Sequence, residues 1–126
     1  MTFTGSTTGT FYIFLKTRVS PFTPFKAMKY IRVYWRQANP NYPTVLYSEL
    51  DDARWELRKV EVFGDGRYQY ASQTASQGCT RLGIEPVPAI EEIAADPQFE
   101  PIEITRREFE EIWLKAVTTG NHDQRQ

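Results

Sequence analysis

Few side chains in this chain could carry out chemistry, and they do not form a catalytic set. The only histidine, His122, lies in a polar C-terminal stretch where nothing nearby would tune it as a base. This argues against Ser-His, Cys-His and His-ligated metal sites together, and a single cysteine, Cys79, cannot form a Cys₄ zinc site. Arg81 could lower the pKa of that thiol, although a small loop residue beside a glycine is the simpler interpretation. The sequence therefore predicts no catalytic residue, no metal ligand and no cofactor.

Carboxylates are plentiful, but their spacing matches no known binding loop. Three of them end one predicted strand and two lie on the next, and no Asp-x-Asp-x-Asp-Gly or phosphate-binding glycine motif occurs. Solvated turn acids are the expected interpretation. The five residues are Glu49, Asp51, Asp52, Glu56 and Glu61.

A strand at residues 30–36 carries the one pattern suited to binding. Tyrosine and arginine alternate there with Ile31, Val33 and Trp35, so the aromatic and basic side chains share one face. Such a face can stack bases and hold phosphates, but the chain has no strong basic field, which argues against nucleic acid. Cross-strand cation–π packing is the alternative. The predicted binding residues are Tyr30, Arg32, Tyr34, Arg36, Arg58, Tyr68, Tyr70 and Arg81.

A β-hairpin over residues 54–70 organises the predicted sheet. The Asp65-Gly66 pair between β-rich arms indicates a type I′ turn, in which both central residues have positive φ. That turn pairs Val60 with Ala71, and it places the valines of one arm and the tyrosines of the other on opposite faces. The expected core residues are Val60, Val62 and Ala71, together with Trp35 or Trp55.

Along the first arm of this hairpin, the alternation of apolar and polar residues changes phase. Trp55 and Leu57 share one parity, whereas Val60 and Val62 share the other, so a strict period of two would turn one pair away from the core. A β-bulge near residues 58–59 would resolve this conflict. The alternative is that both faces of the sheet are covered, in which case the aromatic face is buried rather than free to bind.

Elements outside the hairpin complete an α+β prediction. Strands at 30–36 and 44–50 precede the hairpin, and the four strands with short links predict an antiparallel meander. A long polar loop follows at 72–83, then a short helix at 89–95 and an extended stretch at 99–104. A capping box, Thr105 to Glu108, begins an amphipathic C-terminal helix that should pack on one face of the sheet. Its apolar stripe is Phe109, Ile112, Trp113 and Ala116.

Length and charge predict one domain. The 126 residues carry a net charge of −1, which hides a gradient from a basic N-terminal segment to an acidic C-terminal part. The predicted organisation is an N-terminal extension or packing arm at 1–27, a domain at 28–117 and a polar tail at 118–126. A lone cysteine and the lack of a long apolar run predict a cytoplasmic protein without a membrane segment.

Residues 28–117 resemble a small, widespread bacterial family catalogued as a domain of unknown function. The matching segments include 30–36, 54–61 and 104–109. The remaining ones are 47–51, 64–66, 71–72, 80–83, 86–88, 92–97, 99–101 and Trp113. The resemblance implies a shared fold and brings no activity, catalytic residue or cofactor.

The function expected from the sequence is that of a small, non-catalytic interaction protein. Half-buried tyrosines and arginines suit a protein interface, and an immunity or inhibitor protein with an acidic helix is one form of this hypothesis. A homodimer is another. The rival hypothesis is a small-ligand binder or enzyme that uses arginine, tyrosine and carboxylates around Tyr34, Arg36, Arg54 and the 76–83 loop.

Overall fold

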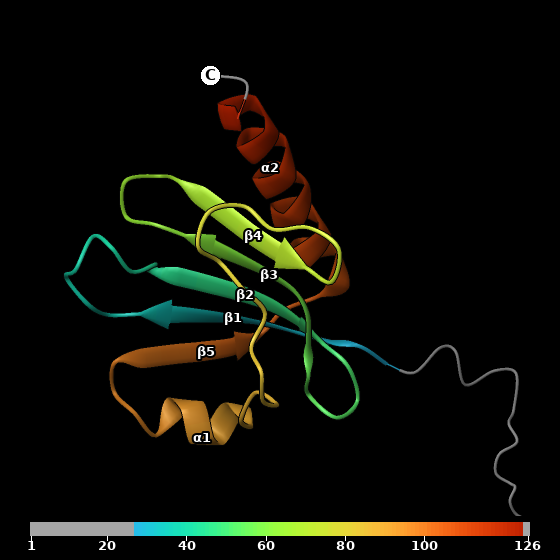
Figure 1. Ribbon diagram of the computed structural model, residues 1–126. Coiled ribbons are helices and arrows are strands. Elements are labelled where there is room, and N and C mark those ends of the chain that lie inside the picture. The colour runs from blue at the N-terminus through green and yellow to red at the C-terminus, as the bar shows by residue number, and fades with distance from the viewer. Residues whose placement is uncertain (1–26, 125–126) are drawn as a thin grey trace, which may run out of the picture.

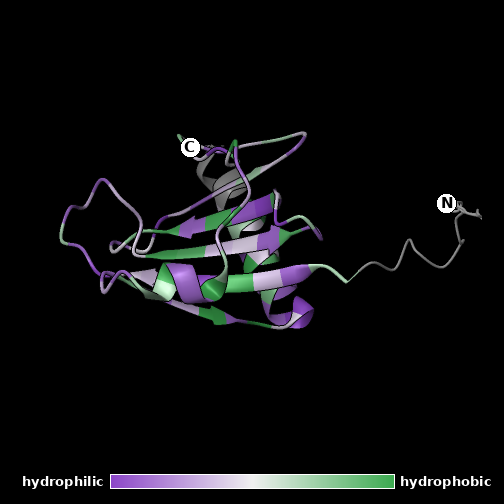
Figure 2. Ribbon diagram, turned by 90° about the horizontal axis from the view of Figure 1, so that it is seen from below, coloured by the Kyte–Doolittle hydropathy of each residue, from purple (hydrophilic) through white to green (hydrophobic). Residues whose placement is uncertain are grey.

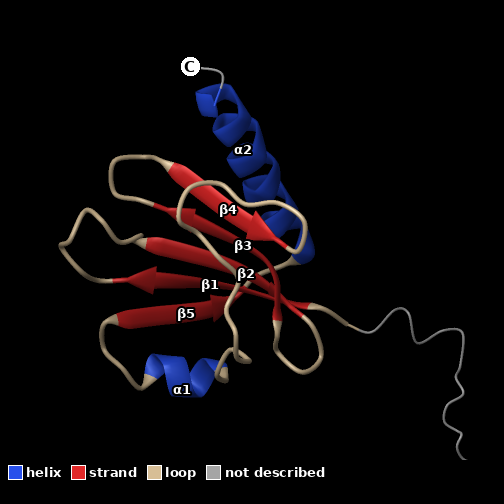
Figure 3. Ribbon diagram, viewed as in Figure 1, coloured by secondary structure: helices blue, strands red, loops and turns tan. Residues whose placement is uncertain are grey.

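The computed structural model describes residues 27–124, which form an α+β fold with one five-stranded antiparallel sheet (Figures 1 and 3). The sheet has the order β4-β3-β2-β1-β5. The strands are β1 Lys29–Trp35, β2 Val45–Leu50, β3 Glu56–Val62, β4 Tyr68–Ser72 and β5 Phe99–Glu103, and the helices are α1 Ile90–Ala94 and α2 Arg106–Gln124. The predicted meander and C-terminal helix are confirmed. The expected N-terminal extension or arm lies outside the described residues, apart from Ala27.

The fifth strand was predicted only as extended chain. β5 pairs antiparallel with β1, from Ile31 opposite Glu103 to Trp35 opposite Phe99. It forms one edge of the sheet and contains Pro101, a residue that weakens any strand prediction from sequence. The hydrogen bonds at the two ends of this pairing indicate that the even-numbered residues of β5 direct their backbone N–H and C=O groups toward β1. Pro101 therefore stands where an N–H would otherwise point away from the sheet, and it blunts the exposed edge.

The turn of the hairpin is one residue longer than predicted. Phe63 and Arg67 form the last pair, because the Phe63 N–H donates to the Arg67 carbonyl (2.9 Å) and Gly66 N–H donates to the Phe63 carbonyl (2.9 Å). Of the three turn residues only Gly66 has a positive φ, 92°, so the loop is a three-residue turn rather than a type I′ turn. The Asp65 carboxylate also accepts the Arg67 N–H (3.1 Å), which favours this closure.

This change of register corrects the predicted faces of the hairpin. Val62 pairs with Tyr68 and Val60 with Tyr70, so these valines and tyrosines share one face. Ala71 is buried, as predicted, but on the other face. A shift of one residue moves every side chain of a strand to the opposite face, which explains why a small error in the turn had this effect.

A bulge resolves the phase conflict in β3, as the sequence predicted. Glu49 pairs with Arg58 and Leu50 with Glu56, so Leu57 is an extra residue on β3. The irregularity lies one residue before the predicted position. Trp55 precedes the strand and is 43% exposed, so it is not the core tryptophan; Trp35 is partly buried.

Each face of the sheet has a different cover. The helix face, which includes Val60 and Tyr70, packs against α2, mainly through β3 and β4. The loop face, which includes Ile31, Val33 and Leu50, packs against α1 and the chain near Val87. Figure 1 shows α2 on one side of the sheet and α1 with the preceding loop on the other. The alternating hydropathy along the strands is visible in Figure 2. Both faces are thus covered in part.

The C-terminal helix begins as predicted and ends later. Thr105 N–H donates to the Glu108 carboxylate (2.8 Å), and Glu108 N–H donates to the Thr105 hydroxyl (3.0 Å), which completes the capping box. Phe109 and Ala116 are fully buried on the sheet. α2 then continues through Gly120 to Gln124, so His122 lies within the helix rather than beyond it. One glycine costs a helix only about 1 kcal/mol and need not end it.

Candidate functional site

Three of the predicted binding residues lie beneath α2 and hold that helix on the sheet. Tyr30 and Tyr70 are 6% and 7% exposed, and they contact the rings of Phe109 and Trp113 respectively. Arg58 lies between these two helix rings, about 5 Å from each centroid (4.9 and 5.0 Å). The sequence placed these side chains on an accessible face. The structure corrects this for the two tyrosines, which are enclosed.

Arg58 is also the centre of a charged network between sheet and helix. Its guanidinium donates to Glu49 on β2 (2.7 and 2.9 Å) and to Glu110 on α2 (2.6 and 3.2 Å). The hydroxyl of Tyr30 donates to the same Glu49 carboxylate (3.0 Å). The Glu49 hydrogen bonds raise the pKa of Arg58, and the bond from Arg58 lowers the pKa of Glu110. The four hydrogen bonds of this network use four of the five N–H donors of the guanidinium, so Arg58 joins the sheet to the helix.

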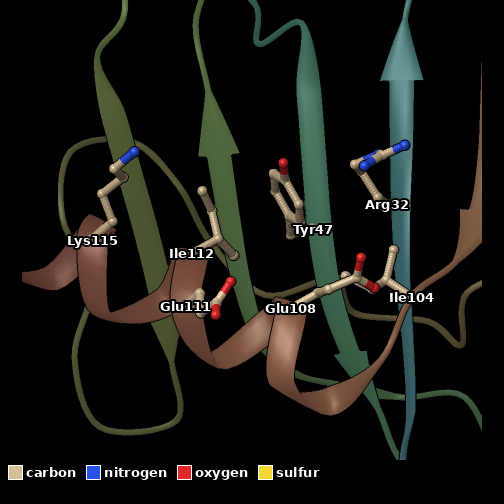
Figure 4. Close-up of a pocket in the computed structure, with 7 residues that line it drawn as sticks. All are labelled: Arg32, Tyr47, Ile104, Glu108, Glu111, Ile112 and Lys115. Carbon is tan, nitrogen blue, oxygen red and sulfur yellow. The ribbon is translucent and has the colours of Figure 1, made fainter.

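The remaining part of the helix face is open and rich in tyrosine. We call Arg32, Tyr34, Tyr47 and Tyr68 the tyrosine surface. Tyr34 is 42% exposed, while the other three are partly buried. Arg32 and Tyr47 are cross-strand partners on β1 and β2, and α2 forms the wall of a hollow beside them, of about 330 Å³ (Figure 4). That wall consists of Glu108, Glu111, Ile112 and Lys115, and Ile104 also lines the hollow.

Arg32 has unused hydrogen-bonding capacity within this surface. Its guanidinium lies 4.8 Å from the ring centroid of Tyr34, in a cation–π arrangement. Its Nε is enclosed and has no hydrogen-bond partner among the residues that the structure describes. Burial raises the pKa of Tyr47, and its neutral phenol can both donate and accept a hydrogen bond. The surface thus offers stacking area beside a cation with one unsatisfied N–H donor.

The family comparison covers the sheet, α1 and the first part of α2. Residues 29–118 match the family described as Domain of unknown function (DUF6881). The chain belongs to this family. The match begins at the first residue of β1 and ends within α2, so it includes both faces of the sheet. Searches of curated proteins and of solved structures each found no match.

The last two predicted residues of this DUF6881 domain lie away from the tyrosine surface. Arg36 follows β1 and binds β5 and the chain before it, through Glu100 (2.8 Å) and the Pro97 carbonyl (2.9 Å). Arg81 belongs to the loop that crosses the opposite face, where its guanidinium donates to the carbonyls of Gly78 and Thr80. The structure therefore brings Arg32, Tyr34 and Tyr68 together and separates Arg36 and Arg81 from them.

The long polar loop of the DUF6881 domain is anchored to the loop face. The Thr80 hydroxyl contacts the Glu61 carboxylate (2.7 Å), and Thr80 as a whole is 2% exposed. Gly83 N–H donates to the Glu56 carboxylate (2.7 Å), which also pairs with Lys59 (3.1 Å). The acids Glu56 and Glu61, expected as solvated turn acids, therefore act as acceptors for this loop.

No group of three His, Cys, Asp or Glu side chains within residues 27–124 is placed to hold a metal ion. Cys79 is exposed, and its thiol is free. In that same range no helix has the length and apolar character needed to cross a membrane.

Sequence reasoning missed two members of this region, Tyr47 and Lys115. Tyr47 lies in the predicted strand 44–50, to which the sequence assigns no binding role. Because the side chains of a strand alternate, Tyr47 must point to the face opposite that of its neighbours Leu46 and Ser48. Lys115 belongs to the predicted C-terminal helix and lies outside its apolar stripe. Its contact with the Tyr68 ring (5.9 Å) depends on where α2 crosses the sheet, which no local pattern shows.

Proposed function

We propose that this DUF6881 domain is a small, non-catalytic cytoplasmic protein that binds a protein partner through the tyrosine surface. The supporting observation is the exposed Tyr34 beside Arg32, whose enclosed Nε has no hydrogen-bond partner among the described residues. Tyrosine and arginine are the residues that most often dominate protein interfaces. A partner that brings an acceptor oxygen to the accessible part of the Arg32 guanidinium and covers Tyr34 would bury the neighbouring rings.

The layout of the surface fits a partner that is itself folded. Tyr34, Tyr47 and Tyr68 lie on the same face of the sheet, and Ile102, opposite Arg32 on the edge strand β5, is 40% exposed. Aromatic side chains on a sheet are held rigidly, so little conformational entropy is lost when they are covered. Inhibition of the partner, as by an immunity protein, is the form of this function that we favour.

The rival small-ligand hypothesis required a pocket shared by Tyr34, Arg36, Arg54 and the 76–83 loop. These groups do not converge. Tyr34 lies on the helix face, whereas the loop packs on the loop face through Thr80 and Gly83. Arg54 is engaged with the carbonyls of Val87 and Pro88.

Site-specific cross-linking tests the proposed interaction. Tyr34 is replaced by the photo-reactive benzoylphenylalanine, and the full chain is expressed in its own host. Trp55 provides a matched control, because it is 43% exposed against 42% for Tyr34 and lies away from the tyrosine surface. We expect a protein adduct from position 34 and none from position 55.

Affinity measurements with the purified adduct partner complete the test. Tyr34→Ala should weaken binding by roughly 30-fold, because an interface tyrosine at a hot spot contributes about 2 kcal/mol. Trp55→Ala should leave the affinity unchanged. Equal adducts from both positions, or unchanged affinity for Tyr34→Ala, would contradict the proposal.

A further inference from the structure

The loop face carries an apolar groove that neither α1 nor the long loop fills. It lies between the sheet, α1 and the chain at residues 87–88, with a volume of about 400 Å³, and it is open along one side. This volume is typical of sites that take one ligand or an anchoring side chain. Its apolar lining consists of Ile31, Val33, Leu46, Val87, Pro88, Ile93 and Phe99.

A second hollow extends the groove along the sheet. Its volume is about 540 Å³, and it shares Leu46 with the groove. Trp35, stacked on Tyr42 at 5.3 Å, and Phe63 form its aromatic lining. The two hollows adjoin at Leu46 on the same face of the sheet, and together they are called the depression. Two open hollows that adjoin in this way suit a stretch of polypeptide with more than one anchoring side chain better than a compact ligand.

The rim of the groove is acidic. Glu92 and Asp96 line it, and neither has a Lys or Arg within ion-pair distance among the residues that the structure describes. Their carboxylates instead accept the backbone N–H groups of Ala89 and Gln98. The chain between Arg81 and Arg106 contains no basic residue. It contains the acids Glu85, Glu91, Glu92, Asp96, Glu100 and Glu103.

We propose that this groove binds a basic, apolar segment of a partner polypeptide. An aliphatic or aromatic side chain of that segment enters between Val33, Leu46 and Ile93, and a neighbouring lysine or arginine lies against Glu92 and Asp96. The charge complementarity selects a basic segment over an acidic one, and the apolar lining selects a chain with buried anchors over a purely cationic one. The site is on the opposite face from the tyrosine surface, so it stands independently of the function proposed above.

Peptide titration of the full chain tests this site. The probe is a short, acetylated and amidated peptide in which lysine alternates with leucine or phenylalanine. Nuclear magnetic resonance should show saturable shifts at Val33, Leu46 and Ile93. The same peptide with glutamate in place of lysine, and one with serine in place of the apolar residues, should both fail to bind.

Charge-removing variants distinguish binding at the groove from a general electrostatic attraction to the acidic surface. Glu92→Gln with Asp96→Asn removes both charges and keeps the carbonyl acceptors, and it should weaken binding about three- to tenfold, as expected for two exposed ion pairs. Glu85→Gln is the matched control, because Glu85 belongs to the same acidic stretch but does not line the groove. An equal loss in the control, or shifts that do not saturate, would overturn the proposal.

The chain's own residues 11–18 have similar chemistry, with Phe11, Ile13 and Leu15 followed by Lys16 and Arg18, and they lie outside the described residues. Cys79 is exposed and lines the adjoining hollow, so a nitroxide label on it reports occupancy of the depression. With no peptide added, amides 11–18 of the full chain should keep their signal. Strong broadening there would mean that the groove is filled in cis and would overturn the assignment to a partner.

Discussion

At the scale of single residues, Arg58 shows why residue type alone does not identify a binding site. It is an arginine among aromatic residues, the composition expected of an interface. In the structure Arg58 joins β2, β3 and α2. Its side chain is 21% exposed, and that of Glu49 is 12% exposed. Tyr34, of the same predicted set, stays open. The difference comes from where α2 crosses the sheet.

Replacement of Arg58 should therefore destabilise the fold. Arg58→Met keeps most of the apolar stem but leaves the Glu49 carboxylate with only Tyr30 as a described side-chain donor. We expect a loss toward the lower end of the roughly 3–5 kcal/mol found when one partner of a buried pair is removed. Urea denaturation measures it. Adding Glu49→Gln should restore part of the loss, and a double variant less stable than the single one would refute this account.

Protonation of Glu110 should lower the free energy of unfolding at acid pH. Its pKa is lowered by the hydrogen bond from Arg58, so the group contributes stability above its unfolded pKa, near 4.3. That contribution is lost as the pH falls through the lowered folded pKa. Urea midpoints from about pH 6 to about pH 3 should drop more for the natural chain than for Glu110→Gln. Parallel curves for the two proteins would show that this carboxylate does not contribute.

At the scale of elements, the length of the hairpin loop determines which face of the sheet each side chain of β4 occupies. The capping box of α2 was predictable because Thr105 and Glu108 act on each other within one turn of chain. The length of the hairpin loop was not predictable, because loops of two and of three residues both suit Gly64-Asp65-Gly66. The choice depends on the Phe63–Arg67 pairing. β5 was missed as a strand because its partner, β1, lies far away in sequence.

The two glycines of this turn should respond differently to substitution. Gly66 has a φ of 92°, so Gly66→Ala should cost about 1–2 kcal/mol through backbone strain alone. Gly64 is not among the residues with positive φ, and an added Cβ would meet only the Thr44 methyl at 3.8 Å. Gly64→Ala should be neutral or slightly stabilising in thermal denaturation. The reverse order would indicate a different turn.

The exposed edge of β5 should depend on Pro101. Replacing this residue by threonine restores an outward N–H in the middle of the strand, which allows a second chain to pair there. We expect Pro101→Thr to associate with increasing concentration in analytical ultracentrifugation. Ile102→Thr is the control, because Ile102 lies on the same strand but its backbone faces β1. Association of both variants, or of neither, would count against edge protection.

At the scale of the whole molecule, the loop face is held together by charges that the sequence could not assign. Glu56, with a side chain only 6% exposed, joins β3 to the 80–88 segment through Gly83 and Lys59. Its acceptor role arises from contacts 27 residues apart along the chain. The same segment supplies Val87 and Pro88 to the apolar groove. Glu56, which also lines the groove, therefore anchors one end of the segment that forms part of its wall.

Glu56→Gln should loosen that segment without affecting the helix face. A hydrogen bond to a charged group contributes about 1.5–3 kcal/mol, so exchange of the Gly83 and Val87 amides should accelerate about tenfold or more. The Ile104 amide, which bonds Tyr30 across β1 and β5, should exchange at its natural rate. Glu103→Gln, with a side chain 63% exposed, is the control and should change neither. Faster exchange at Ile104 would mean global destabilisation, whereas a selective effect would show that the cover of the loop face opens independently of α2.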